Sequence, residues 1–232
     1  MEDIEKIKLI CCDVFARMAY GIAARSDHWV DIELLPMLAH VKPDDLRRDL
    51  QEVINRACES DSYDRIILAY GLCGNATAGL TSQIPLIIPR IHDCCAMFMG
   101  SREKFLQTFG HRPSTPWRSS GYMERCTEIM ADYLKLVAEY GEENAQYIWE
   151  TMKAKEAVYI KLEGYEYNDT QHRYIDQLAK EGCKVEVVAG DASWFERLIN
   201  GPWDKDDFLE LLPGTTIEPI YDMEEIFRAT EI

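Results

Sequence analysis

The sequence predicts an α/β fold: a doubly wound, mainly parallel sheet with helices on both faces, forming three layers. Short apolar runs bounded by Gly or Pro alternate along the chain with amphipathic stretches. The runs at 66–70 and 85–89 show no polar–apolar alternation, which is typical of strands buried on both faces of a parallel sheet. The chain has 232 residues, 47% of them hydrophobic, enough to bury a sizeable core. We expect one α/β domain over 1–232, or two lobes: 1–120 with the candidate metal site, and 121–232.

The first elements follow from apolar spacing and from helix-start signals. We expect a strand at 8–12, an Ala-rich helix at 14–25 and a second strand at 29–38. A further helix begins near Pro43, because proline suits the first helical turn, and Asp44 and Asp45 complement the helix dipole there. Leu46 and Leu50 begin an apolar series at helical spacing, so this helix buries one face.

The middle of the chain, from Tyr63 to Phe105, organises the rest. It predicts two strands, each followed by a loop that contains cysteine, and then a helix at 95–109. Asp93 is expected as the N-cap of that helix. A helix start beside Cys94 would lower the pKa of its thiol and favour the thiolate.

The second half continues the alternation of helices and strands. We expect an irregular loop at 111–120, a long helical stretch at 122–155 interrupted near 140–144, a strand at 157–162, a helix at 169–180, a strand at 184–188, helices at 194–200 and 204–211, and a segment at 213–217 that closes the sheet region. The loop is long enough to fold over a site, although a plain connector fits as well.

Charge and composition exclude several classes of partner. The formal net charge of −16, with no clustered basic stretch, argues against nucleic-acid and anionic-membrane binding. The acidic start leads directly into a strand, unlike a signal peptide, and no apolar run approaches the length that spans a bilayer. We therefore expect a soluble, cytoplasmic protein. In that reducing compartment eight cysteines indicate metal binding, catalysis or burial rather than disulfides.

Four candidate metal ligands lie at or just past the carboxyl ends of predicted strands: Cys12, Cys73, His92 and Cys94. The carboxyl ends of parallel strands share one edge of a sheet, where ligands of α/β proteins collect. Three thiolates and an imidazole suit a tetrahedral Zn²⁺ ion, and thiolate-rich sets also suit an iron–sulfur cluster. The alternative is a set of buried thiols and a hydrogen-bonded histidine. Cys11 could face the site in place of Cys12, since neighbouring residues of a strand point to opposite faces.

Three neighbouring residues are candidates for supporting roles or substrate contacts. Asp93 could orient His92 or cap the next helix. Arg90 could pair with a carboxylate or phosphate, or bridge surface acids. Asn75 and its flanking glycines could present backbone N–H groups to an anion. Residues assigned to packing are Tyr70, Cys58, Cys126 and Cys183.

Three motifs resemble the signature of an uncharacterised family, domain of unknown function sixteen-thirty-eight. They are Tyr-Gly-Leu-Cys-Gly-Asn at 70–75, Ile-Pro-Arg-Ile-His-Asp-Cys at 88–94 and Gly-Ser-Arg-Glu-Lys-Phe at 100–105, with weaker matches at 10–12, 140–145, 189–191 and 213–217. The resemblance covers nearly the whole chain. It departs from the family pattern in its doubled cysteines and in Thr-Pro-Trp at 115–117, where Pro-Gly-Trp is expected. Members of this family often accompany corrinoid-dependent methyltransferase systems of methanogenic archaea and anaerobic bacteria. The resemblance therefore implies that setting for this chain.

The leading hypothesis is a metal-binding protein of anaerobic one-carbon metabolism. His92-x-Cys94 with a distant thiolate is similar to the zinc site of corrinoid-linked thiol methyltransferases, which have a different fold. A metal-dependent methyltransferase of this kind would activate a small thiol as a thiolate, with a partner protein supplying the corrinoid and its methyl donor. Redox handling of the corrinoid and metal delivery also fit.

Two alternatives remain open. One is a non-catalytic accessory protein whose acidic surface docks a methyltransferase or a corrinoid protein. The other is a racemase-like enzyme with metal-free cysteines as acid and base, which the Cys-Gly-Asn sequence at Cys73 resembles only loosely. That chemistry needs a second thiol across the substrate, and Cys183 precedes its predicted strand and so lies at the wrong end.

Overall fold

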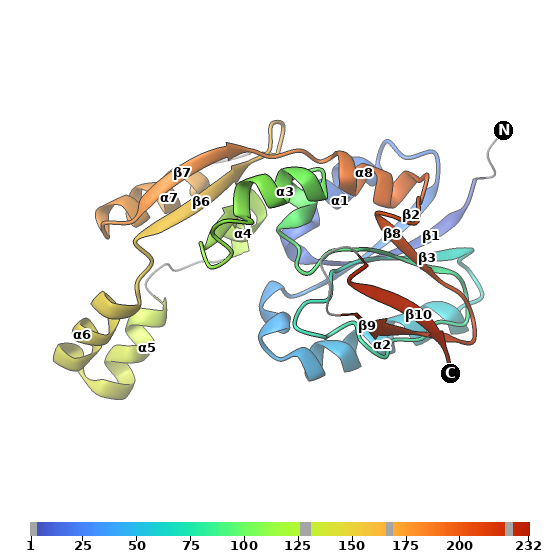
Figure 1. Cartoon of the computed structure of the whole chain (residues 1–232), viewed down its shortest axis with the longest axis horizontal. Coiled ribbons are helices and arrows are strands. Elements are labelled where there is room, and N and C mark those ends of the chain that lie inside the picture. Colours follow the sequence, from blue (N-terminus) through green and yellow to red (C-terminus); the bar gives the residue numbers. More distant parts are fainter. Residues whose placement is uncertain (1–3, 126–130, 166–168, 221–224) are drawn as a thin grey trace. The chain divides into compact units, whose positions relative to one another are not determined.

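The structure, a computed structural model, describes residues 4–125, 131–165, 169–220 and 225–232 (Figure 1). The chain divides into two compact units. Unit 1 comprises Met1–Thr108 and Asp191–Ile232, and unit 2 comprises Phe109–Gly190. The predicted lobes, 1–120 and 121–232, have other boundaries, because the chain returns to unit 1 after residue 190. All the candidate metal ligands belong to unit 1.

Unit 1 is built on a five-stranded sheet in the order β2-β1-β3-β4-β8. Its strands are β1 (Lys6–Cys12), β2 (Trp29–Leu35), β3 (Arg65–Ala69), β4 (Leu86–Pro89) and β8 (Phe208–Leu211). The first four are parallel and β8 is antiparallel at the edge. This confirms the predicted α/β class and the mainly parallel sheet. Every residue of β4 is buried, which is why its sequence shows no alternation.

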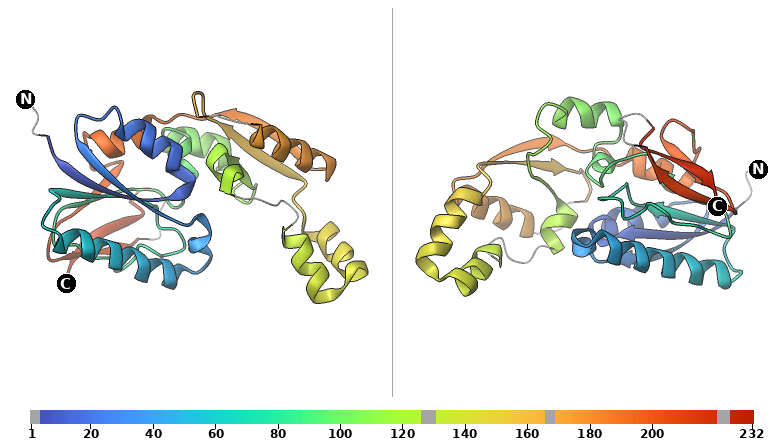
Figure 2. Two further views of the ribbon diagram at one scale, coloured as in Figure 1. Left: turned by 180° about the vertical axis from the view of Figure 1, so that it is seen from behind. Right: turned by 60° about the horizontal axis from the view of Figure 1, so that its bottom comes forward.

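The described part of unit 1 contains four helices, three of which contact this sheet (Figures 1 and 2). They are α1 (Ala16–Ala23), α2 (Pro43–Glu59), α3 (Arg102–Phe109) and α8 (Ser193–Asn200), with 3-10 turns η1 (Asp13–Phe15), η2 (Met37–Val41) and η3 (Ala96–Phe98). The views show α2 on one side of the strands and α1 and α8 on the other. As predicted, α2 starts at Pro43, carries Asp44 and Asp45 in its first turn and buries Leu46 and Leu50.

Unit 2 contains a second, smaller sheet in the order β5-β6-β7, all parallel. Its elements are β5 (Trp117–Ser119), α4 (Ser120–Arg125), α5 (Ala131–Tyr140), α6 (Glu142–Met152), β6 (Glu156–Lys161), α7 (Thr170–Lys180) and β7 (Lys184–Ala189). A core that includes Met123, Tyr159, Tyr174 and Cys183 joins α4 and α7 to the sheet. The predicted interruption near 140–144 is Gly141, whose φ of +76° separates α5 from α6.

Three predicted elements were wrong in type or extent. The helix expected at 204–211 is instead strand β8, because its apolar residues pair with the open edge of β4. The helix expected at 95–109 is broken at Gly100, where φ is +76° and a Cβ would lie 2.5 Å from Cγ of Asp191. Residues 117–119, expected within a loop, form β5 beside β6.

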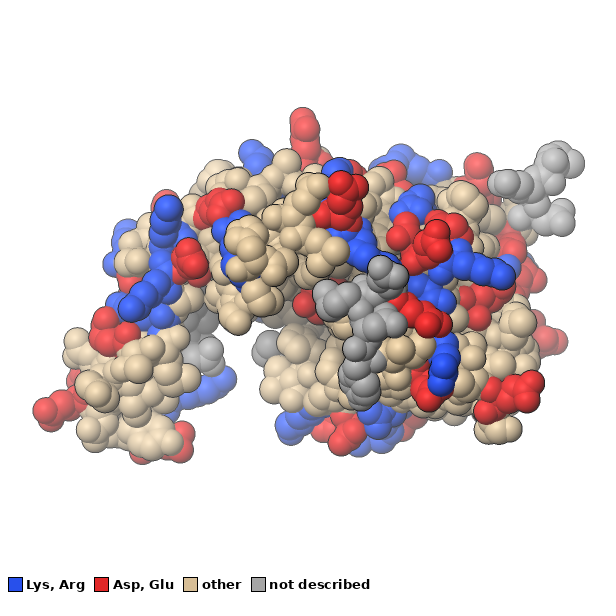
Figure 3. All heavy atoms as spheres, in the orientation of Figure 1, with Lys and Arg blue, Asp and Glu red and all other residues tan. Residues whose placement is uncertain are grey.

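Strands β9 (Thr215–Pro219) and β10 (Phe227–Glu231) form an antiparallel pair. Figure 3 shows acidic and basic side chains intermingled on one face of the molecule. Within the described ranges, no helix combines the length and the apolar character needed to cross a membrane.

Candidate functional site

The candidate site lies at the carboxyl edge of the parallel strands of unit 1. Strand β1 ends at Cys12, while Cys73 and Cys94 lie in the loops that follow β3 and β4. The parallel register of β1 with β3, and of β3 with β4, brings these ends to one edge. Strand β2 lies on one side of β1 and β3 on the other, so the strand order reverses here. Ligands of open α/β sheets bind at such a reversal.

Backbone hydrogen bonds join the two cysteine-containing loops. The N–H of Leu72 donates to the carbonyl of Ile91, and the N–H of Cys73 donates to the carbonyl of His92, both at 2.9 Å. This approach requires glycine at position 71, because a Cβ there would lie 2.6 Å from the oxygen of Ile91. The loops after β3 and β4 are therefore held together independently of any ligand.

The loop after β3 contains an unusual turn. Cys73, Gly74 and Asn75 have φ values of +46°, +66° and +72°, all in the left-handed region. Glycine adopts this conformation freely and asparagine tolerates it, whereas a cysteine there is strained. Strained residues that the surrounding fold holds in place cluster at functional positions.

Three thiols converge at this edge, those of Cys12, Cys73 and Cys94. Burial raises the pKa of the Cys73 thiol to about 12 and that of Cys12 to about 11. Burial also raises the pKa of Cys94, and the nearby Cys73 and Cys12 raise it further. These mutual effects place the three thiols in one neighbourhood. Cys12, rather than Cys11, is among the groups that affect the other two thiols.

The prediction that a helix start lowers the pKa of Cys94 was wrong. Only the short turn η3 follows, and α3 begins farther along the chain. Burial of the Cys94 thiol therefore dominates and raises its pKa well above the usual range. Without a bound cation, the thiol is protonated at neutral pH.

Tyr70, assigned to packing from the sequence, also belongs to this cluster. The residue is only 4% exposed, and its hydroxyl oxygen has no hydrogen-bond partner among the described residues. Burial raises the pKa of Tyr70 well above its usual value, and Cys12, Cys11, Cys73 and Cys94 raise it further. Its hydroxyl group is therefore an unpaired donor close to the thiols. The sequence signal was its position directly after β3.

A second residue that sequence reasoning missed is His40, in η2 after β2. Its Nδ1 donates to the carbonyl of Met37 at 2.5 Å, and its Nε2 is the other ring nitrogen. Partial loss of hydration raises the pKa of the Asp93 carboxyl group, while the Cys95 hydrogen bond, His92 and His40 lower it. His40 and Asp93 are therefore neighbours, and all four parallel strands contribute to this edge.

The supporting residues proposed from the sequence have mixed placements. Asp93 accepts the N–H of Cys95 at 2.8 Å, in front of η3. The guanidinium group of Arg90 donates to the carbonyls of Lys205 and Glu225, at 2.9 and 2.7 Å, and so binds the C-terminal segment. The carbonyl of Asn75 accepts Nη2 of Arg47 at 2.7 Å.

The remaining cysteines lie elsewhere. Every described cysteine is a free thiol. Cys95 is buried beside the site. Cys58, on α2, has its sulfur 3.6 Å from the hydroxyl oxygen of Ser82. Cys183 is in the core of unit 2. Cys126 is outside the described residues.

The arrangement has the donor types of a metal site without its spacing. No set of three or more His, Cys, Asp or Glu side chains in the described part of the chain is arranged to hold a metal ion. The Nε2 atom of His92 is buried and has no partner among the described residues, and His92 lines a small cavity to which none of the cysteines contributes.

A family model described as "Protein of unknown function (DUF1638)" matches residues 34–199. The chain belongs to this family. The match includes Cys73, His92 and Cys94, and Cys12 precedes it. No curated protein and no solved structure matches the chain.

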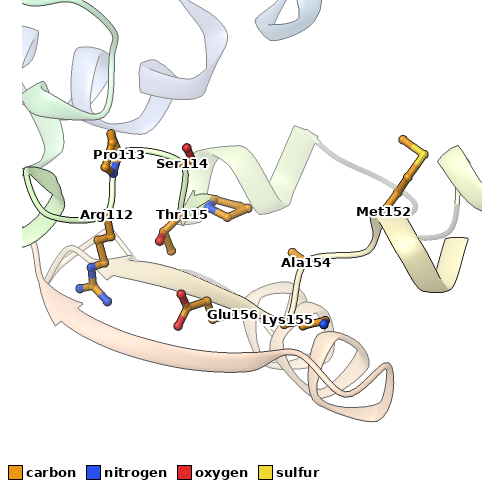
Figure 4. A pocket seen from close by; sticks show the side chains of 9 residues that line it. Arg112, Pro113, Ser114, Thr115, Met152, Ala154, Lys155 and Glu156 are labelled. Atoms are coloured by element: carbon orange, nitrogen blue, oxygen red, sulfur yellow. The ribbon is translucent and has the colours of Figure 1, made fainter.

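The DUF1638 match also spans the whole of unit 2, which has a hollow of its own. Figure 4 shows this open pocket of about 440 Å³, between the loop at 112–116 and the segment that enters β6. Arg112 and Glu156 line it, but Nη2 of Arg112 pairs with Glu186 at 3.1 Å. None of the predicted site residues lines this pocket.

Proposed function

We propose that this DUF1638 protein binds a thiophilic metal ion through Cys12, Cys73 and Cys94, with His92 as the fourth ligand. The observation that carries the proposal is the convergence of thiols from three strand ends where the strand order reverses. We also infer that the sheet of unit 1 is doubly wound in three layers, as the sequence predicts.

The chemistry of the side chains supports a metal. Thiolates and an imidazole are ligands of Zn²⁺, and a set of thiolates suits an iron–sulfur cluster. Burial disfavours ionised thiols, so a bound cation would offset the cost of three thiolates in one place. The sulfur atoms are not already arranged around a common point, so metal binding would require rotation of the cysteine side chains about χ1.

We propose that the bound metal serves methyl transfer to a small thiol, with a corrinoid protein as partner. A thiophilic metal supplies a nucleophilic thiolate at neutral pH. The substrate sulfur would gain the methyl group as the carbon–cobalt bond breaks, leaving the electron pair on the corrinoid. The hydroxyl group of Tyr70 is buried without a partner among the described residues and would turn toward a substrate sulfur held there, and the buried strand ends would exclude water. The free thiols of the described residues support a cytoplasmic location.

Metal content tests the proposal. Protein purified without oxygen should contain zinc or iron by elemental analysis, and a colourless sample with stoichiometric zinc excludes a cluster. Cys73→Ala should lose the metal, whereas Cys58→Ser, a cysteine change on α2, should keep it. Wild-type protein without metal after reconstitution, or full metal content in Cys73→Ala, would refute the assignment.

The net charge of −16 favours one alternative, a non-catalytic accessory protein that docks its partner through acidic residues. An assay with corrinoid protein and thiol acceptor separates the two functions. Turnover that depends on Cys73 supports the enzyme. Salt-sensitive binding of the corrinoid protein without turnover supports the accessory role.

A further inference from the structure

A small cavity in unit 1 adjoins the loop that carries His92. Its polar walls are Arg90, His92, Arg102 and Trp194, and its apolar walls include Phe105 and Leu106. The volume is about 20 Å³, which is room for one or two water-sized groups. None of the thiols lines it, so the cavity is separate from the proposed metal site.

Three residues that line this cavity each have a buried polar atom without a hydrogen-bond partner among the described residues. These atoms are Nε2 of His92, Nε of Arg102 and Nε1 of Trp194. The indole is 0% exposed, so solvent does not reach its N–H group. Buried polar atoms are rarely left unpaired, and three around one small space indicate an occupant that hydrogen-bonds to them.

The charge of the cavity favours an anion. Nη2 of Arg102 donates to the carbonyls of Asp206 and Arg90, at 3.1 and 3.4 Å. Its guanidinium group has no carboxylate partner within the described residues. Arg90, the second guanidinium group on the cavity, donates to backbone carbonyls of the C-terminal segment. Two positive charges beside apolar walls attract a negative ligand strongly, because the low local dielectric screens them little.

We propose that this cavity binds a small monovalent anion of one to three heavy atoms, such as a halide or formate. Arg102 and Trp194 each supply an N–H donor in every protonation state that proteins reach. An anion accepts both of these hydrogen bonds and is also attracted by the two guanidinium groups, whereas a neutral water molecule gains little from their charge.

Thermal unfolding of the full chain tests the proposal, with bromide or formate titrated against gluconate at constant ionic strength. Both small anions should raise the melting temperature saturably, and sulfate, which is too large for the cavity, should not. Arg102→Lys and Trp194→Phe should each weaken anion binding at least tenfold, because each removes one donor. Trp203→Phe is the matched control, since its indole donates to the carbonyl of Leu198, outside the cavity.

The metal-site variant Cys73→Ala separates this proposal from the previous one. It should still bind bromide through Arg102 and Trp194, even when it has lost the metal. In crystals soaked in bromide, an anomalous peak is expected within hydrogen-bond distance of Nε1 of Trp194. An ordered water only at that position, the absence of a saturable shift in wild-type protein, or equal affinity in Arg102→Lys would overturn the proposal.

Discussion

Cys73 combines two unfavourable properties in one residue. Its backbone lies in the left-handed region, which costs a non-glycine residue about 1 kcal/mol. Its thiol lies near two others in a site that disfavours their ionisation. Glycine would relieve the backbone strain, and alanine would remove the buried thiol. The presence of cysteine is therefore best explained by a ligand that the thiol binds.

Stability of the metal-free chain should fall at alkaline pH. The pKa of Cys73 rises from the ordinary 9.0 to about 12, so the native state keeps this proton longer than the unfolded state. The stabilisation is complete below pH 9 and is lost as pH rises toward 12. Urea unfolding at pH 8 and at pH 10.5 measures the loss, which should be smaller in Cys73→Ser. Equal losses in both proteins would contradict this interpretation.

Tyr70→Phe should have opposite effects on the metal-free and metal-loaded protein. Removing an unpaired buried hydroxyl group should stabilise the metal-free chain by about 1 kcal/mol. Losing a donor near the thiols should weaken metal affinity about tenfold. Urea unfolding and a competition titration with a chelator measure the two effects. Tyr63→Phe is the control, because its hydroxyl donates to Asp31 and its loss should destabilise both forms.

Part of the site is predictable from residue types and strand ends. Cys73 and Cys94 directly follow unmistakable buried strands, so their placement on one edge needs no structure. His40 lies in a 3-10 turn after a weakly defined strand, and its proximity to Asp93 depends on tertiary packing. Tyr70 resembles any core aromatic residue in sequence. Which nitrogen of His92 faces the cavity is a matter of rotamer, which no sequence pattern specifies.

At the scale of elements, the site depends on how closely two loops approach. The loop after β3 contacts the loop after β4 through two backbone hydrogen bonds, at Leu72 and Cys73. Gly71 allows this contact, because backbone atoms of Ile91 and His92 occupy the space of a Cβ. Backbone packing therefore fixes the distance between the two loops, while the cysteine side chains can still rotate.

Gly71→Ala should separate the loops and abolish metal binding. The new Cβ would lie 2.6 Å from the backbone oxygen of Ile91, which cannot move without breaking its hydrogen bond from the N–H of Leu72. We expect a loss of more than about 2 kcal/mol in the free energy of unfolding. Gly79→Ala is the matched control. It has φ of +80° and open space around its Cβ, so it should cost about 1 kcal/mol and retain the metal. Full metal retention in Gly71→Ala would contradict the argument.

Elements with strong local signals were predictable, and those decided by tertiary contacts were not. The start of α2 follows from Pro43 and the acidic first turn, whatever the helix packs against. Strand β8 has the short apolar sequence Phe-Leu-Glu-Leu, which suits a helix or a strand equally well. Its pairing with β4 selects the strand. Likewise, only the close approach of Asp191 shows why the helix expected after Cys95 breaks at Gly100.

At the scale of the whole molecule, unit 2 is an insertion between two parts of unit 1. The chain leaves unit 1 at Thr108 and re-enters it at Asp191. The N–H of Asp191 donates to the carbonyl of Phe98 at 2.8 Å, and its carboxylate pairs with Lys104 at 2.6 Å. Both contacts of Asp191, where the chain re-enters unit 1, are therefore made within unit 1.

Unit 1 should therefore fold without unit 2. Residues 109–190 can be replaced by a flexible Gly/Ser linker of about eight residues, with a mean span of roughly 16 Å, since the carboxylate of Asp191 already pairs with Lys104 of α3. The shortened chain should unfold cooperatively and contain as much metal as the full chain, because every proposed ligand lies in unit 1. A shortened chain that folds but contains no metal would show that unit 2 contributes to the site.

The position of β8 has a consequence for synthesis on the ribosome. This strand covers the open edge of β4, yet it is translated only after all of unit 2. At ordinary elongation rates the interval is on the order of ten seconds. During that time the nascent chain exposes an unpaired strand edge beside three reduced sulfur atoms. Newly made protein is thus most vulnerable to aggregation and oxidation before its last forty or so residues emerge, which favours expression under strictly anaerobic conditions.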